Sequence, residues 1–539
     1  MADGTSLLDA LREDLGCRSV KDGCSPQGQC GCCTVWVDGA PRVACVTPVR
    51  RVAGRRVTTT EGLAPAVAAR WAAAFTATGA SQCGFCTPGI VLRLAALASG
   101  GRPITRDTIE GALRAHLCRC TGWQSIVEAA EQALGVTPPT DHPPRDPLLA
   151  SWRAQLEGPQ YQSSGPEVVL GGGGFADDTA PAGAVVLLGA GQAEPAPDLR
   201  AARAGTGRVQ GRNSTVALDH PVPLPGGDWD LTLQTTWVEP AYVEPDASWA
   251  RPGGAPASPL ANGGAFGGKR HSPVPARAQA LADRHGAPAR VLWRREDVVR
   301  LGPKRPPLAL GLRADGSGTL RLGHTEGSPE LTGLVERLGV LAPGLDVEVV
   351  PITGPKVSPE LRGAGWAEVL AARHALAAGP ADEPGTGRAD IALPGAGRAT
   401  VVLQARATPR ATLAVEVWAG EVLCEVTLRS YVLGAVHQAL GLVWSEGIAV
   451  GGDGEPVDLT IRSFGILAAR DMPEVTVTLH PDDTWPVNGS DAVFVATLAA
   501  AARAEGWPAR WPTRRTGGRA QPRHVPASGA PAPVREEPA

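Results

Sequence analysis

The sequence lacks the features that mark secreted, membrane-spanning and nucleic-acid-binding proteins. Its start, Met1-Ala2-Asp3-Gly4-Thr5, has neither the basic residues nor the apolar core of a signal peptide. No apolar run reaches the roughly 18 residues that cross a bilayer, and the stretch from Ile90 to Ala98 contains Arg93. A formal net charge of -3, without a Lys/Arg block interleaved with aromatics, argues against nucleic acid. We therefore expect a cytoplasmic protein with small-molecule and protein partners, and with no nucleic acid and no membrane.

Length and composition bound the architecture. A chain of 539 residues exceeds what one hydrophobic core usually covers, which predicts two to four domains. The 67 glycines and 50 prolines predict long loops.

Cysteines are concentrated in the first quarter of the chain. Of 11 cysteines, only Cys424 lies beyond Thr121. In a reducing compartment such a concentration indicates metal binding rather than disulfides. Two close pairs, Cys83-Gly-Phe-Cys86 and Cys118-Arg-Cys120, could enclose a soft metal centre, either zinc or an iron–sulfur cluster.

A second group of cysteines precedes these pairs, with the spacing Cys24, Cys30, Cys33 and Cys45. The plant-type two-iron ferredoxin spacing has four residues in the first interval, where this chain has five. Cys33 is chosen over Cys32 because it preserves the following two-residue interval, and Cys32 is expected to point the other way. Residues 34–39 alternate like a strand, and Asp38-Gly39 predicts a hairpin turn.

Helical periodicity predicts five helices in this region, over residues 5–16, 64–80, 88–99, 106–114 and 125–134. The last four would form a small bundle. The two thiol pairs lie at predicted helix ends, where free amides can stabilise an anionic cluster.

The stretch from Leu11 to Leu134 resembles the paired [2Fe-2S] domains of the molybdenum hydroxylases, the xanthine dehydrogenase and aldehyde oxidase family. The resemblance implies a β-grasp domain that binds one cluster through Cys24, Cys30, Cys33 and Cys45. It implies a four-helix domain that binds the other through Cys83, Cys86, Cys118 and Cys120. The alternative is a four-cysteine zinc module, although zinc sites favour two Cys-x2-Cys pairs over a Cys-x-Cys pair.

The resemblance continues into the second half of the chain. The glycine-rich segment from Asn262 to Lys269 is similar to the loop beside the molybdenum in this family, and Leu361 to Trp366 is similar to its Arg-Gly-Phe-Gly segment. Gln82 matches a residue that contacts the pterin. The resemblance thus implies Gln82, Gly264, Phe266 and Arg362 as cofactor-binding candidates.

The family's catalytic base is a glutamate that this sequence does not retain. In the matching stretch, Pro486 to Phe494, the position falls on Ser490 or, with a one-residue shift, on Asp491. Serine cannot act as the base, and aspartate is one methylene short. Asp491 and Arg362 remain the catalytic candidates, against the simpler interpretation that Asp491 caps the following helix. Glu244 is kept as a remote candidate, and His437 is interpreted as a core residue.

The predicted fold class is α+β multidomain. We expect a β-grasp ferredoxin-like domain over 1–63, a helical [2Fe-2S]-binding domain over 64–136, a linker over 137–165, a mixed α/β molybdopterin-binding-like domain over 166–512, and a disordered tail over 513–539. The domain over 166–512 is roughly half the length expected for a two-part molybdopterin-binding unit. No Gly-Gln-Gly pterin loop is found between Arg362 and Gly434.

The resemblance implies an oxidoreductase that carries electrons through two [2Fe-2S] clusters from a molybdenum–pterin site, its own or a partner's, to a separate flavoprotein. No FAD domain is expected in this chain, so an FAD-binding subunit, and possibly a separate complete molybdenum subunit, are the implied partners. The alternative is a non-catalytic electron-transfer and assembly subunit whose second half is a degenerate scaffold.

Overall fold

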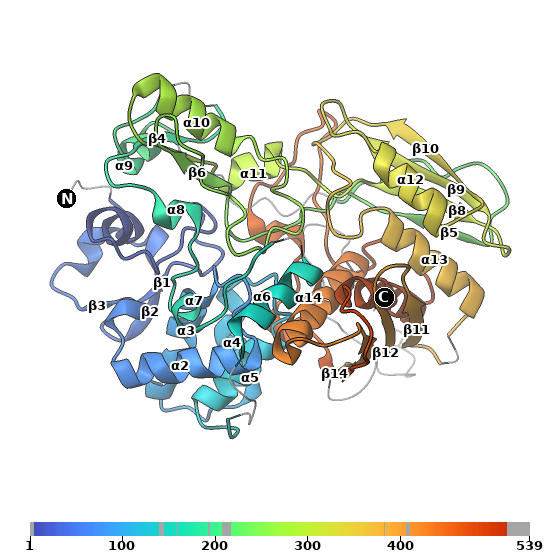
Figure 1. Ribbon diagram of the computed structural model, residues 1–539, viewed down its shortest axis with the longest axis horizontal. Coiled ribbons are helices and arrows are strands. Elements are labelled where there is room, and N and C mark those ends of the chain that lie inside the picture. The colour runs from blue at the N-terminus through green and yellow to red at the C-terminus, as the bar shows by residue number, and fades with distance from the viewer. Residues whose placement is uncertain are drawn as a thin grey trace, which may run out of the picture.

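A computed structural model describes residues 5–139, 145–158, 160–191, 194–206, 217–381, 383–405 and 410–514. The N-terminal half lies on one side of the molecule and the C-terminal layers on the other (Figure 1). The predicted tail over 513–539 lies outside the described residues, except for Thr513 and Arg514.

The first region is a small sheet with a helix, as the α+β prediction requires. Its strands take the order β2-β1-β3, and the Asp38-Gly39 turn joins β1 to β2. Both turn residues have positive φ, 50° and 78°, which suits a tight hairpin. Cys45 lies in a 3₁₀ turn just beyond β2. The elements are α1 (Leu7–Asp9), the π-helical turn η1 (Ala10–Asp14), β1 (Thr34–Val37), β2 (Ala40–Val43), η2 (Ala44–Val46), η3 (Val49–Val52), β3 (Val57–Thr58) and η4 (Thr60–Gly62).

Four helices follow, and their predicted positions are confirmed. The apolar faces of α2 and α5 pack together, and Trp71, Phe75 and Ile126 are buried between the helices. Gly79 in the left-handed conformation ends α2, and a Thr105/Thr108 capping box begins α4. The elements are α2 (Pro65–Thr78), α3 (Thr87–Ala95), η5 (Ala96–Ser99), α4 (Arg106–Ala112), η6 (Leu113–Ala115) and α5 (Gln124–Ala133).

The stretch predicted as a linker over 137–165 contains an ordered helix, α6 (Pro147–Glu157), so the prediction is wrong for that part. Asp146 caps α6, which packs against α14 in the second half. Arg153 is fully buried and donates to the carbonyl oxygens of Val487 (2.8 Å) and Glu421 (2.7 Å). These partners lie far along the chain, so the Pro-rich local sequence does not reveal the helix.

Strands β4, β7 and β6, between residues 185 and 292, form a three-stranded sheet in the order β4-β7-β6 that lies near the N-terminal region. A buried charge network joins the two parts: Arg12 contacts Asp177 (2.6 Å) and Asp178 (2.9 Å). The elements are α7 (Pro166–Val169), α8 (Ala176–Thr179), β4 (Val185–Leu188), α9 (Leu199–Ala204), β6 (Ala247–Ala250), α10 (Val274–His285), β7 (Ala289–Leu292) and α11 (Arg295–Leu301).

Two four-stranded sheets form the far side of the molecule (Figure 1). The order of one is β10-β9-β8-β5 and of the other β11-β12-β13-β14. The first contains β5 (Leu231–Gln234), β8 (Leu308–Leu312), β9 (Gly318–His324) and β10 (Leu345–Pro351), with α12 (Thr332–Leu341) and α13 (Trp366–Ala378) beside it. The second contains β11 (Thr386–Ala392), β12 (Arg398–Gln404), β13 (Thr412–Trp418) and β14 (Glu474–His480).

Two long helices form the core of the second half. The helix α14 (Glu425–Trp444) is apolar around most of its circumference and is buried along nearly its whole length. It packs against α15 (Ser490–Ala504), which covers β11 and β12. The short turns η7 (Ile461–Phe464) and η8 (Ala469–Asp471) lie between them in sequence. Among the described residues, no helix is both long and apolar enough to cross a membrane.

Candidate functional site

The first cysteine set is buried beside the small N-terminal sheet. Cys24, Cys30, Cys33 and Cys45 are 2%, 1%, 2% and 7% exposed. Backbone amides point at two of the sulfurs: Gln29 N donates to Cys24 Sγ and Cys45 N to Cys33 Sγ, each at 3.4 Å. Hydrogen bonds from Cys30 and Cys45 lower the pKa of the Cys24 thiol well below its usual value. The four thiols therefore face one another.

Cys32 does not point away from this set, so that expectation is wrong. Its thiol hydrogen-bonds with Cys30 and lies close to Gly23, and Cys32 is 1% exposed. The chain turns tightly at Gly31 between the two cysteines, so the alternation of an extended strand does not apply there. Cys33 faces Cys45, as the ligand assignment requires.

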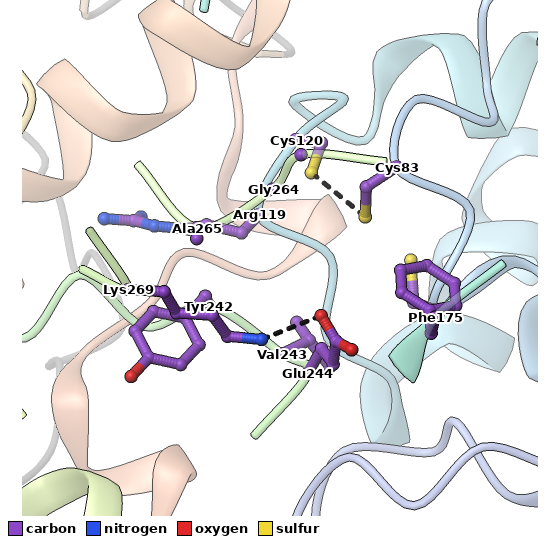
Figure 2. Close-up of a pocket in the computed structure, with 12 residues that line it drawn as sticks. Cys83, Arg119, Cys120, Phe175, Tyr242, Val243, Glu244, Gly264, Ala265 and Lys269 are labelled. Atoms are coloured by element: carbon purple, nitrogen blue, oxygen red, sulfur yellow. Dashed lines mark hydrogen bonds and ion pairs between the residues drawn. The ribbon is translucent and has the colours of Figure 1, made fainter. Parts of the chain in front are cut away.

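The second set lies at the ends of the helical bundle and forms two sulfur pairs. Cys83 Sγ and Cys120 Sγ are 3.6 Å apart. A dashed line joins these two sulfurs in Figure 2. Cys86 hydrogen-bonds with Cys118 and lowers the pKa of the Cys118 thiol to about 6. Two thiolates on one tetrahedral metal ion, with bonds of ~2.3 Å, lie about 3.8 Å apart. Each iron of a [2Fe-2S] cluster takes two cysteines, so the donor set fits such a cluster.

No group of three or more His, Cys, Asp or Glu side chains able to hold a single metal ion is found within the described part of the chain. The thiols instead come in the pairs just described.

The glycine-rich segment 262–269 lies directly on the second cysteine set. Asn262 Nδ2 donates to the Cys83 carbonyl at 2.7 Å. Gly264 has φ +83°, and a Cβ there would lie 2.9 Å from Cys83 Cβ, so only glycine permits this approach. Lys269 fixes the far end of the segment, because its buried Nζ contacts Glu244 Oε2 (2.8 Å) and two backbone carbonyls (Figure 2). Burial raises the pKa of Glu244 to about 7, against the opposing effect of Lys269.

A cavity of about 390 Å³ lies beside this segment and is lined by residues 263–267 of it. Its lining brings together the residues that the sequence singled out and several it did not. These are Gln82, Cys120, Glu157, Gly263, Gly264, Phe266, Arg362, Trp366, Tyr431 and Asp491. Gln82 Nε2 donates to the Cys120 carbonyl and to Ser430 Oγ, both at 3.1 Å. Gln82 thus ties the second cysteine set to α14 at the cavity wall.

Arg362 reaches across the cavity wall to the start of α15. Its Nη2 donates to Ser490 Oγ at 2.6 Å, and its Nε donates to Asp491 Oδ1 at 3.3 Å. The two catalytic candidates are therefore joined to each other.

Asp491 does not cap α15, so the capping interpretation is wrong. The helix begins at Ser490, and Asp491 lies within its first turn. The carboxylate of Glu157 performs this task, because it accepts from Gly489 N (3.1 Å) and Ser490 N (2.8 Å). Sequence reasoning missed Glu157 because it lies in the stretch taken for a linker.

Two buried histidines are structural. Burial lowers the pKa of His437 to about 3, and its Nε2 contacts the Leu467 carbonyl at 3.1 Å, which confirms it as a core residue. Burial also lowers the pKa of His116 to about 3. His116 lies between the two cysteine sets and contacts Thr34 Oγ1 at 3.2 Å. The only indication of this contact in the sequence is the position of His116 two residues before Cys118.

The N-terminal region of the chain resembles known iron–sulfur proteins in sequence. Residues 59–131 match the family model of a [2Fe-2S] binding domain. The nicotinate dehydrogenase small FeS subunit of Eubacterium barkeri is 40% identical over 132 residues, which are 24% of this chain and 82% of that subunit. The xanthine dehydrogenase iron-sulfur-binding subunit of Escherichia coli O157:H7 is 42% identical over 127 residues, 23% of this chain and 79% of that subunit.

A solved structure extends the similarity in fold to the second half. The aldehyde oxidoreductase of Desulfovibrio gigas superposes with a TM-score of 0.68, covering 96% of this chain and 97% of that chain at 14% identity. The α+β multidomain fold is therefore that of an aldehyde oxidoreductase. With its paired cysteine sets and its close similarity to small FeS subunits, the chain belongs to the molybdenum hydroxylase family of xanthine dehydrogenases and aldehyde oxidoreductases.

Proposed function

We propose that this chain carries single electrons from the cavity beside Cys120 through two [2Fe-2S] clusters to a separate flavoprotein. One observation carries the proposal: Cys120 lines the 390 Å³ cavity, so a cluster on Cys83, Cys86, Cys118 and Cys120 would adjoin any redox group bound there.

The two cysteine sets are joined by a short backbone connection. Leu117 N, one residue before Cys118, donates to the Cys30 carbonyl at 3.0 Å. This hydrogen bond places the two sets next to each other. Because the cavity adjoins Cys120, the cluster of the helical domain would receive an electron first, and the cluster on Cys24, Cys30, Cys33 and Cys45 would pass it on. The relatives named as small FeS or iron-sulfur-binding subunits support the presence of partner subunits. That one of these partners binds FAD is implied by the family resemblance of the cysteine motifs.

The cavity could hold a molybdenum–pterin group along the segment from Gly263 to Gly267, with Gln82 and Arg362 on its walls. Such a group, when bound, would supply the substrate oxidation that feeds the clusters. The residues of this chain would position the group. Gly264 lets the segment lie directly against Cys83, and the contacts of Lys269 hold the segment in place.

A second candidate function is an electron-transfer and assembly subunit without catalysis of its own. The residues at the start of α15 favour this second function. A general base here would need a glutamate that is free of an ion pair. The chain instead has Ser490 and the shorter Asp491, and Arg362 contacts both side chains. Glu157, also on the cavity wall, is committed to Arg153 (2.9 Å) and to the amides of α15.

Metal analysis of the purified chain, with EPR after reduction, tests both functions. About four iron atoms per chain and two distinct two-iron signals are expected for either. Stoichiometric molybdenum and pterin would support catalysis, whereas iron alone would favour the second candidate. Hydroxylation of an aldehyde or purine by the isolated chain, lost in Arg362→Ala, would overturn the second candidate. A colourless, zinc-loaded protein would overturn both.

A further inference from the structure

The least buried cysteine of the first set is followed in the sequence by an exposed residue. Cys45 is 7% exposed, against 1–2% for Cys24, Cys30 and Cys33. Its neighbour Val46 is 58% exposed. A Cβ on Gly28 would lie 2.8 Å from Val46 Cγ1, so Val46 rests on the cysteine loop itself. The protein layer between the thiols and solvent is therefore thin at Cys45 and Val46.

Arginines flank Cys45 and Val46 in the sequence, on β2 before them and on η3 and before β3 after them. Five of them are exposed, and we call residues 42–56 the basic face: it carries Arg42, Arg50, Arg51, Arg55 and Arg56. Asp38 is the only acidic residue in the sequence between 34 and 60, and it pairs with Arg55 at 2.7 Å. The whole chain has a formal net charge of -3, so the basic face reverses the overall sign locally.

We propose that the basic face is the docking surface for an acidic face of the electron-accepting flavoprotein, and that electrons leave the chain at Cys45 and Val46. This inference rests on the proposed function and adds the place and the chemistry of the partner. Each transfer moves one electron from the reduced cluster to the acceptor, and no bond forms or breaks in the chain. A surface of one sign attracts a partner of the other and raises its association rate.

The position of the basic face suits a large partner. The strands β2 and β3 lie at the outer edge of the N-terminal half, on the opposite side of the molecule from β11 and β8 (Figure 1). The second half packs against Arg12 through Asp177 and Asp178, and it contacts the cysteine loop through Leu459 and Arg462. These contacts leave Val46 58% exposed.

Two small oxidants of opposite charge test the proposal without the natural partner. The full chain with its clusters is reduced with dithionite under anaerobic conditions and mixed with either ferricyanide, a trianion, or tris(phenanthroline)cobalt(III), a trication. Each oxidant takes one electron, and bleaching or recovery of the cluster absorbance gives the rate. At ~0.01 M ionic strength, where the Debye length is about 30 Å, we expect salt to slow ferricyanide and to accelerate the cobalt complex.

The charge-reversal variant Arg42→Glu/Arg51→Glu should slow ferricyanide about tenfold at low salt and accelerate the cobalt complex. The matched control is Arg313→Glu/Arg388→Glu, which changes the net charge equally at two exposed arginines beside β8 and β11. It should change either rate less than about twofold. If charge reversal disturbs folding, Arg42→Gln/Arg51→Gln should give the same directions with a smaller effect.

The outcomes separate this inference from the proposed function. Equal effects of the two double variants, or oxidant rates that do not depend on the charge of the basic face, would overturn the docking surface. If two intact EPR signals are still observed in that case, the proposed function remains supported. Absence of both EPR signals from the unmodified chain would instead overturn the proposed function.

Discussion

The backbone amide of Ser490 donates a 2.8 Å hydrogen bond to the carboxylate of Glu157, a residue 333 positions earlier in the chain. This bond, with that of Gly489, anchors the start of α15 to α6. Ser490 Oγ also accepts a hydrogen bond from Arg362, which lines the cavity. Glu157 therefore helps to hold this part of the cavity wall, because it positions Ser490.

Replacing Glu157 should therefore destabilise the second half. Arg153 and Glu157 have no exposed side-chain area, and Glu157→Ala would leave Arg153 buried without its carboxylate. We expect a loss of about 3–5 kcal/mol in the free energy of unfolding, measured by urea denaturation. Asp390→Asn, which removes an exposed ion pair with Arg398, is the control and should change little. Equal stability of the two variants would contradict the anchoring role.

Gly264→Ala should damage one cluster and spare the other. The new Cβ would lie 2.9 Å from Cys83 Cβ and 3.0 Å from Cys83 Sγ, so either the segment or the thiol must move. We expect EPR to show a broadened or lost signal for the helical-domain cluster and an unchanged signal for the other. Gly253→Ala is the matched control, because Gly253 also has a left-handed φ (+68°) but nothing lies within 4 Å of its Cβ position. Two sharp signals in both variants would contradict the claim that the cluster requires glycine at position 264.

The assignment of Cys33 rather than Cys32 as a ligand can be tested by iron content. Cys33→Ser should lower iron from about four to about two atoms per chain, because one cluster loses a thiolate. Cys32→Ser should retain about four, since Cys32 contacts Cys30 but is not part of the predicted ligand set. The reverse result would exchange the roles of the two residues.

Glu244 gives a prediction for the pH dependence of stability. Burial raises its pKa from 4.5 to about 7 in the folded chain. Between these values the folded state binds more protons than the unfolded state, so the free energy of unfolding falls as pH rises from about 4.5 to 7. The contribution lost is up to about 3 kcal/mol.

Urea denaturation at pH 5 and pH 8 measures this effect. Glu244→Gln should reduce the difference between the two pH values, because glutamine does not titrate. Asp283→Asn, at an exposed position in α10, should leave the difference as it is in the unmodified chain. An unchanged difference in Glu244→Gln would assign the pH dependence to other groups.

Local patterns predicted much of the first 136 residues. The helices of the bundle, the Asp38-Gly39 turn and the gathering of thiols all follow from spacing within a few dozen residues. The fold class was predicted as well, through the resemblance of the cysteine motifs.

The contacts that shape the cavity could not be predicted from local sequence patterns. Glu157 is recognisable as a helix cap only through its hydrogen bonds to Gly489 and Ser490, and Asp491 as the partner of Arg362 only across 129 positions. A proline-rich neighbourhood, before residue 147, suggested a linker where distant carbonyls hold Arg153 in a buried helix. Each of these three misses concerns a polar group whose partner lies more than a hundred residues away. The orientation of Cys32 was missed for a local reason, the tight turn at Gly31.

The packing of α14 on the cysteine region has a final consequence. A Cβ on Gly434 would lie 2.1 Å from the Cys120 carbonyl oxygen, and a Cβ on Gly122 would lie 2.4 Å from the Leu433 carbonyl oxygen. Each backbone therefore touches the other through a glycine, and neither surface can separate without exposing the other to water. The cluster-binding region and the second half should therefore unfold in one cooperative step.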